Sequence, residues 1–201
     1  MVYINYRQTI NKTKKMKRTI IINLFGGPGS GKSTVASGLF YTFKSKGLTC
    51  DNPYEFPKQV AWEDNKSQIS DQLYIFANQH RGIVRSYGKV NYIILDSPLL
   101  LSLVYKNGYT GDYPAKFYND SFDSMVLELF KSYENINIFL DRADRQFQQE
   151  GRFQSEEESE EVDKKIKMIM DENDIPYHSV KVGDNEIRRI IEIIRNEKES
   201  N

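Results

Sequence analysis

The segment GGPGSGKS at residues 26–33 constrains the fold of this chain more than any other part of the sequence. It fits the pattern G-x-x-x-x-G-K-[ST], in which small residues let successive backbone N–H groups surround a phosphate. The apolar, β-branched run at residues 19–25 precedes it and predicts a buried strand. Residues 32–46 follow, with apolar side chains at every fourth position, as on one face of a helix. A strand, a glycine-rich turn and a helix N-terminus in this order are the context that phosphate binding requires.

The residues of this loop have distinct chemical roles. Lys32 can reach the β- and γ-phosphates of a nucleoside triphosphate, and the Ser33 hydroxyl can ligate Mg²⁺. A glycine-rich turn that holds no ligand is the alternative interpretation. We expect ATP and Mg²⁺ as cofactors, with the phosphates bound by Gly27, Gly29, Ser30, Gly31, Lys32, Ser33 and Thr34.

Strand and helix patterns alternate along the rest of the chain. Two prolines within residues 51–58 predict an irregular segment there. Apolar strands that alternate with helices indicate a parallel sheet covered on both faces. We expect a three-layer α/β/α P-loop NTPase fold with a five-stranded, mainly parallel sheet, in one domain over residues 19–201. Further strands are predicted at 48–50, 90–96, 136–141 and 177–182, and helices at 68–85, 122–133, 155–173 and around 187–194.

The composition is typical of a soluble domain. Lys and Arg total 28 and balance 28 Asp and Glu, and 39% of the residues are hydrophobic. The single cysteine, Cys50, excludes an internal disulfide and is typical of a reducing compartment. No apolar run reaches the ~18 residues of a membrane span, and the amino terminus lacks the order of a secretory signal. We therefore expect a cytoplasmic protein.

Residues 1–18 form a basic leader that contains no acidic residue. Such a segment could contact nucleic acid, or it could be a solvated leader before the first strand. Its basic residues are Arg7, Lys12, Lys14, Lys15, Lys17 and Arg18.

Two acidic residues follow predicted strands and are candidates for the active site. Asp96 ends the strand at 90–96, and the carboxyl ends of parallel strands are where ligands of open α/β sheets bind. It could hold Mg²⁺ or orient the attacking hydroxyl, or it could only cap the next turn. Glu55 follows the strand at 48–50 and could accept a hydrogen bond or a proton from the acceptor hydroxyl, or be a surface acid.

An arginine-rich segment follows the strand at 136–141. A mobile arginine can neutralise the charge that phosphoryl transfer builds on the equatorial oxygens and can exclude water. We expect a lid over about 141–158 in which Arg142 and Arg152 act, with Gly151 as a hinge. A solvated helix whose acids pair with these arginines is the alternative.

The order of these motifs is similar to small bacteriophage P-loop kinases, which are related to thymidylate kinases and to the kinase part of ribosylnicotinamide kinases. The resemblance covers roughly residues 19–182. One phage branch resembles the 5-hydroxymethyluridine DNA kinases, which use ATP to phosphorylate the hydroxymethyl group of a modified base within DNA. The stretches that carry the resemblance are GGPGSGKST, EFPK…WE, DQ…A…Q, LDSPLLL, FLDR and GRFQSEEES…VD.

The resemblance implies a nucleoside-kinase-like fold, ATP phosphates on Gly29 to Thr34 and a lid around Arg142 and Arg152. It also implies an acceptor side built from Glu55, Asp96 and the helix that bears Gln72, Gln79 and Arg85. Aromatic residues near this side could stack on a base, although aromatic residues at helical spacing usually belong to the core. They are Tyr54, Phe56, Trp62 and Tyr74.

The sequence departs from thymidylate kinases at one position. Those enzymes place an arginine directly after the aspartate of the third strand, whereas Ser97 and Pro98 follow Asp96 here. The absence of this arginine favours a hydroxyl acceptor over a free nucleoside monophosphate.

These patterns predict an ATP-dependent kinase that phosphorylates a nucleoside-type hydroxyl. The most specific hypothesis is 5-hydroxymethyluridine in DNA. A free nucleoside or nucleotide acceptor is the first alternative, and a regulatory or DNA-dependent ATPase is the second.

Overall fold

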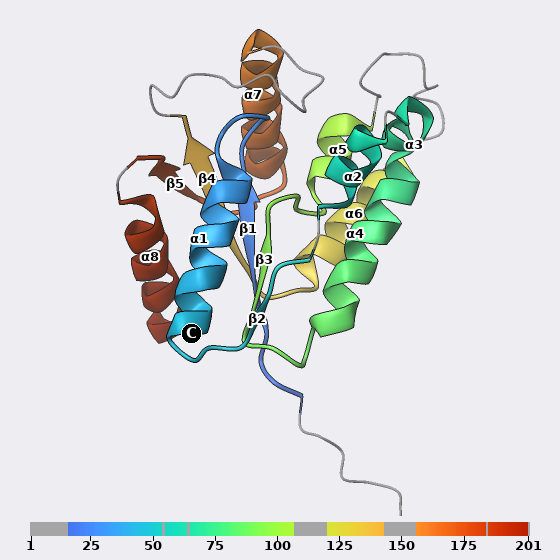
Figure 1. The fold of residues 1–201 in the computed structure, drawn as a ribbon. Coiled ribbons are helices and arrows are strands. Elements are labelled where there is room, and N and C mark those ends of the chain that lie inside the picture. Colours follow the sequence, from blue (N-terminus) through green and yellow to red (C-terminus); the bar gives the residue numbers. More distant parts are fainter. Residues whose placement is uncertain are drawn as a thin grey trace, which may run out of the picture.

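Five parallel strands form one sheet in the order β2-β3-β1-β4-β5 in the computed structural model (Figure 1). The structure describes residues 16–53, 55–63, 65–106, 120–142, 156–183 and 185–200. The prediction of a five-stranded parallel sheet is confirmed. Its strands are β1 (Ile20–Phe25), β2 (Cys50–Asp51), β3 (Tyr92–Leu95), β4 (Asn135–Asp141) and β5 (His178–Lys181).

Helices cover both faces of the sheet, which gives the three layers that the alternating pattern predicted. Helices α1 and α8 lie on one face, and α4, α5, α6 and α7 lie on the other (Figure 1). The short helices α2 and α3 pack beside α4. The helix bounds are α1 (Lys32–Ser45), α2 (Phe56–Trp62), α3 (Lys66–Ser70), α4 (Gln72–Ser86), α5 (Leu101–Tyr105), α6 (Asp120–Lys131), α7 (Glu156–Glu172) and α8 (Glu186–Ser200).

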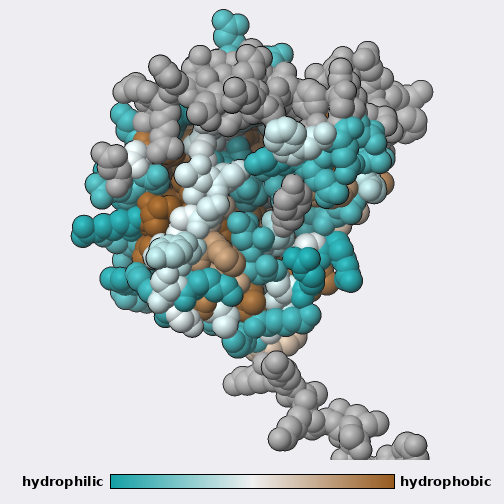
Figure 2. Space-filling model, viewed as in Figure 1, coloured by the Kyte–Doolittle hydropathy of each residue, from teal (hydrophilic) through white to brown (hydrophobic). Residues whose placement is uncertain are grey.

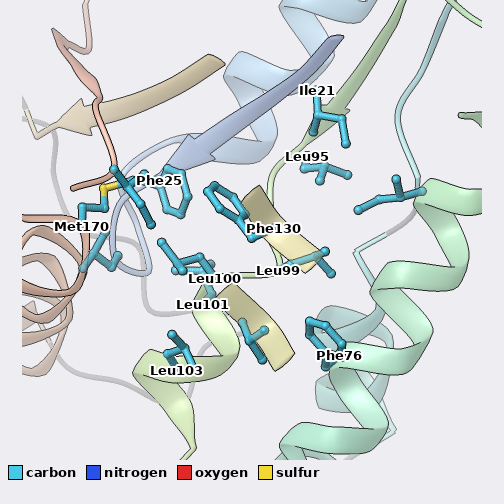
Figure 3. Close-up of a cluster of buried hydrophobic side chains, with 14 of the residues drawn as sticks. Ile21, Phe25, Phe76, Leu95, Leu99, Leu100, Leu101, Leu103, Phe130 and Met170 are labelled. Atoms are coloured by element: carbon cyan, nitrogen blue, oxygen red, sulfur yellow. The ribbon is translucent and has the colours of Figure 1, made fainter. Parts of the chain in front are cut away.

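Alternate residues of the central strand β1 point to opposite faces of the sheet and therefore belong to two separate hydrophobic clusters. Ile20 and Leu24 pack beneath α1 and α8. Ile21 and Phe25 point to the other face, where Phe25 meets the ring of Phe130 from α6 edge to face, with 6.4 Å between centroids (Figure 3). Because all six residues of β1 are buried, this strand is the fixed centre from which the glycine-rich loop starts.

Two expectations for the segment after β2 were right only in part. The irregular segment predicted over 51–58 gives way to α2 at Phe56, because Pro57 lies in the first turn of the helix, where its missing N–H needs no partner. The single helix predicted over 68–85 is divided at Asp71, whose carboxylate accepts the N–H of Tyr74 at 3.0 Å and caps α4.

The carboxyl ends of three neighbouring strands bring the main candidate residues to one edge of the sheet. The glycine-rich loop leaves β1, Asp96 follows β3, and Arg142 follows β4. The chain crosses from one side of β1 to the other between β3 and β4, so this edge lies at a topological switch point.

The described end of the leader lies at the opposite edge of the sheet. The N–H of Lys17 donates to the carbonyl of Gly88 at 2.9 Å, in the turn that leads into β3. Residues 1–15, with Arg7, Lys12, Lys14 and Lys15, lie outside the described residues.

Hydrophilic residues dominate the surface over α4, and hydrophobic residues are visible where α1 borders α8 (Figure 2). Among the described residues, no helix is both long enough and apolar enough to span a membrane.

Candidate active site

The glycine-rich loop turns on three glycines with positive φ. Gly26, Gly29 and Gly31 have φ values of 140°, 86° and 89°, which residues with a Cβ rarely adopt. Gly31 is also the N-cap of α1, and its carbonyl accepts the N–H of Val35 at 2.9 Å. The glycines of the motif therefore allow the backbone to fold back over the N-terminus of α1, as a phosphate-binding loop requires.

Lys32 is held inside this loop. Its Nζ donates to the carbonyls of Gly26 at 2.6 Å and Gly27 at 2.9 Å. Burial lowers the pKa of Lys32, and the nearby carboxylates of Glu55 and Asp96 oppose that shift. The ammonium group is therefore poorly solvated in the folded protein, a state that a bound phosphate would stabilise.

Asp96 lies beside the start of α1. Only 7% of the residue is exposed, and burial raises the pKa of its carboxyl group. A hydrogen bond with the Ser33 side chain and the charge of Lys32 act in the opposite direction on that pKa. Lys32, Ser33 and Asp96, which the sequence analysis selected separately, thus meet at the ends of β1 and β3.

Glu55 lies at the start of α2, on the same side of the site. Its carbonyl accepts the N–H of Lys58 at 3.2 Å, and its carboxylate raises the pKa of Lys32. Lys58 in turn lowers the pKa of Asp96. The first turn of α2 therefore contributes charges of both signs to the site.

The residues that the resemblance implied on α4 have different roles. Gln79 Nε2 donates to the Ser97 hydroxyl at 2.6 Å, next to Asp96, and its buried Oε1 has no hydrogen-bond partner among the described residues. Gln72 is buried and donates to the carbonyl of Ile69 at 2.8 Å, which is a structural contact. Arg85 Nη2 lies 3.6 Å from Asp51 Oδ2 on the edge strand β2, where Asp51 pairs with Ile93 of β3.

The aromatic residues near the start of α2 and α4 also differ. Phe56 packs on a small apolar cluster and meets Tyr74 edge to face, with 5.3 Å between centroids. Trp62 is 68% exposed and Tyr74 is 42% exposed. Tyr54 lies outside the described residues. Of the three aromatic residues that the structure describes here, the core interpretation fits Phe56 alone.

Arg142 contacts two residues to which the sequence analysis assigned no role. Its Nε donates to Asp163 Oδ2 at 2.8 Å, and its Nη2 donates to the Ser159 hydroxyl; both partners lie on α7. Two signals pointed to them: both belong to the stretch GRFQSEEES…VD that carries the resemblance, and polar residues at i,i+4 on a predicted helix share a face. Arg152 and residues 143–155 of the predicted lid lie outside the described residues.

The side chains and backbone of this site fit Mg²⁺ and a nucleoside triphosphate. The Ser30 hydroxyl is buried and has no hydrogen-bond partner among the described residues. Ser33 and Asp96 supply oxygen atoms, which Mg²⁺ prefers, together with phosphate and water oxygens. The fixed loop, one ammonium and one carboxylate are therefore suited to hold phosphates beside a divalent cation.

Comparison with known proteins places the chain in a family. The model of a family described as an AAA domain (AAA_28) matches residues 21–188, so the chain belongs to this family. A uridine kinase of Halalkalibacterium halodurans is 38% identical over 65 residues, which is 31% of this chain and 31% of that protein. The chain thus matches less than a third of the length of this curated relative.

Two solved structures share the fold over 89% of this chain and 99% of their own. Thymidylate kinase from Ehrlichia chaffeensis superposes with a TM-score of 0.61 at 15% identity. Deoxyadenosine kinase from M. mycoides, solved with bound dATP, superposes with a TM-score of 0.57 at 21% identity. The P-loop nucleotide kinase fold expected from the sequence is confirmed.

Proposed function

We propose that this member of the AAA domain family is an ATP-dependent kinase that transfers the γ-phosphate to a hydroxyl group of a nucleoside-type acceptor. The observation that carries the proposal is the meeting of Lys32 and Ser33 with Asp96 at the ends of neighbouring strands. The relative and the two structural neighbours are all kinases of nucleosides or nucleotides, which supports the same class.

In this proposal the chain acts by positioning and electrostatics. Mg·ATP would supply the phosphoryl group and a divalent charge. Backbone N–H groups of Gly29 to Thr34 bind the phosphates, and the Lys32 ammonium neutralises charge on the β- and γ-phosphates. Ser33 and Asp96 are the proposed magnesium ligands.

The transfer step forms a bond between the acceptor oxygen and the γ-phosphorus and breaks the bond to the leaving ADP. Asp96 and Glu55 are the candidates to orient the hydroxyl and accept its proton. Arg142 and Arg152 are proposed to stabilise the charge on the transferred group. No covalent enzyme intermediate is required.

The residues near Asp96 on the acceptor side of the site favour a nucleoside as the acceptor. The unpartnered Oε1 of Gln79 can accept an N–H from a base edge, while Nε2 remains bonded to Ser97 beside Asp96. Ser97 stands where thymidylate kinases carry an arginine, which favours a hydroxyl acceptor. The most specific form of the proposal is the hydroxymethyl group of 5-hydroxymethyluridine in DNA, and a free nucleoside or nucleoside monophosphate is the alternative.

A panel of acceptors tests this proposal. The protein is incubated with Mg²⁺ and γ-labelled ATP, together with DNA containing 5-hydroxymethyluridine, unmodified DNA, free nucleosides or nucleoside monophosphates. Label on the modified DNA alone supports the specific form, and label on small acceptors alone selects the alternative. Absence of label from every acceptor would contradict the kinase proposal.

The second candidate is a regulatory or DNA-dependent ATPase, because the family description, an AAA domain, names no acceptor for a phosphoryl group. The same experiment separates it from a kinase if free phosphate is also measured. An ATPase would release labelled phosphate to water, and DNA would increase that release without becoming labelled.

A further inference from the structure

Two side chains of α7, one helical turn apart, form hydrogen bonds with the backbone of the phosphate-binding loop. Asp163 Oδ1 accepts the N–H of Gly27 at 2.5 Å, and the Ser159 hydroxyl donates to the carbonyl of Pro28. Val162 and Ile166 on the same helix are buried in the core, which fixes the rotation of α7. Ser159 and Asp163 are therefore held against the loop.

The same two side chains hold Arg142, and we call Arg142, Ser159 and Asp163 the clamp. Asp163 accepts from Gly27 with one carboxylate oxygen and from Arg142 with the other. Ser159 accepts from Arg142 and donates to Pro28. The clamp therefore joins the guanidinium to the loop backbone by two parallel links.

The absence of a side chain at Gly27 makes this approach possible. A Cβ at this position would clash first with the backbone carbonyl of Ser159, and it would lie 2.6 Å from Arg142 Nη2 and 3.0 Å from the Ser159 hydroxyl. Gly27 is not among the glycines with positive φ. Space for the clamp, rather than backbone conformation, therefore explains the glycine at this position.

The charges of the clamp act on the lysine of the loop. Asp163 raises the pKa of Lys32, and Arg142 lowers it. The side chains of Arg142 and Asp163 are only 21% and 18% exposed, so their ion pair is partly shielded from water. A guanidinium group has five N–H donors, and the bonds to Asp163 and Ser159 use two of them.

We propose that Asp163 is a positioning residue for nucleotide binding, which holds Arg142 against the phosphate-binding loop with Ser159 as the second fixed point. The inference rests on the proposed function, which places the phosphates of ATP on this loop. A guanidinium group held in place before binding loses less conformational freedom when phosphates arrive, so the clamp increases affinity.

A double-mutant cycle on Mg·ATP affinity tests this role. Asp163→Asn retains an oxygen that can accept the Gly27 N–H and removes the charge that holds Arg142. Arg142→Gln removes the guanidinium. We expect each variant to bind Mg·ATP about tenfold more weakly in isothermal titration, the size expected for loss of a hydrogen bond between charged groups. The double variant should bind Mg·ATP only slightly more weakly than either single variant, because both changes remove the same Arg142–Asp163 interaction.

A matched control separates this role from a general effect on α7. Glu160→Gln removes the same charge from an exposed position on the same helix and should leave the affinity unchanged. Losses that multiply to about hundredfold in the double variant would overturn the inference, because Asp163 would then act independently of Arg142. A wild-type protein that binds no Mg·ATP would instead contradict the proposed function itself.

Discussion

Asp96 occupies a position where its charge destabilises the ligand-free protein. Burial raises the pKa of this carboxyl group despite the Ser33 hydrogen bond and the charge of Lys32. Lys32 shows the complementary effect, since burial lowers its pKa. Opposite charges that are buried together beside a phosphate-binding loop are typical of a functional site. Such charges make the folded protein less stable than neutral side chains at the same positions would.

Replacement of Asp96 by Asn should stabilise the free protein and greatly reduce turnover. The folded pKa of Asp96 lies above its unfolded value, so the wild type regains stability as the pH falls from neutral through the folded pKa. The difference in melting temperature between Asp96→Asn and wild type should therefore be largest at neutral pH and disappear below the unfolded pKa. Melting curves across this pH range measure it, and a difference that does not change with pH would contradict the burial of an ionised Asp96.

Lys32→Ala should leave the fold intact and remove most phosphoryl transfer. The side chain bonds only to the loop carbonyls of Gly26 and Gly27 among the described residues. Loss of a contact that stabilises charge in the transition state costs ~2.7–4 kcal/mol, which is a hundredfold or more in rate. Steady-state turnover measures this, and near-normal activity would place the active site elsewhere.

At the scale of helices and strands, the sequence predicted the features that depend on residues close together in the chain. The loop, its flanking strand and helix, and the end of the helix predicted over 32–46 are local features. Gly47 follows that helix and ends α1 with φ 73° and the two backbone hydrogen bonds of a Schellman motif. The clamp could not be predicted, because Gly27 and Asp163 are 136 residues apart and meet only when β4 and α7 pack beside β1. The division of the predicted helix at Asp71 also depends on a cap that the hydrophobic pattern does not reveal.

Gly27→Ala tests the contact between the loop and α7. The added Cβ would displace Arg142 and Ser159, so both the melting temperature and the affinity for Mg·ATP should fall. Gly183→Ala is the matched control, because nothing lies within 4 Å of a Cβ there and its φ is not positive. Equal effects of the two substitutions would contradict the close approach of α7 to the loop.

At the scale of the whole molecule, the candidate active site and the described end of the leader lie at opposite ends of the strands. Lys17 donates a backbone hydrogen bond to Gly88 near the amino ends of the strands, whereas the phosphate-binding loop lies at their carboxyl ends. Residues 1–15 lie outside the described residues, and a contact between their basic side chains and DNA stays a prediction.

Deletion of residues 1–15 should weaken DNA binding without changing nucleotide binding. Affinity for Mg·ATP should not change, because the proposed nucleotide site is assigned to other residues. Affinity for DNA should fall, and its dependence on salt should become weaker as four basic residues are lost. Fluorescence anisotropy of labelled DNA over a salt series measures both, and an unchanged salt dependence would support a solvated leader.

Isothermal titration of Mg·ATP into the wild type and Lys32→Ala tests the central claim most directly. The wild type should bind one nucleotide per chain, and Lys32→Ala should bind it far more weakly while retaining a cooperative melting transition. Failure of the wild type to bind, or equal affinity of the folded variant, would contradict a nucleoside triphosphate site built on this loop.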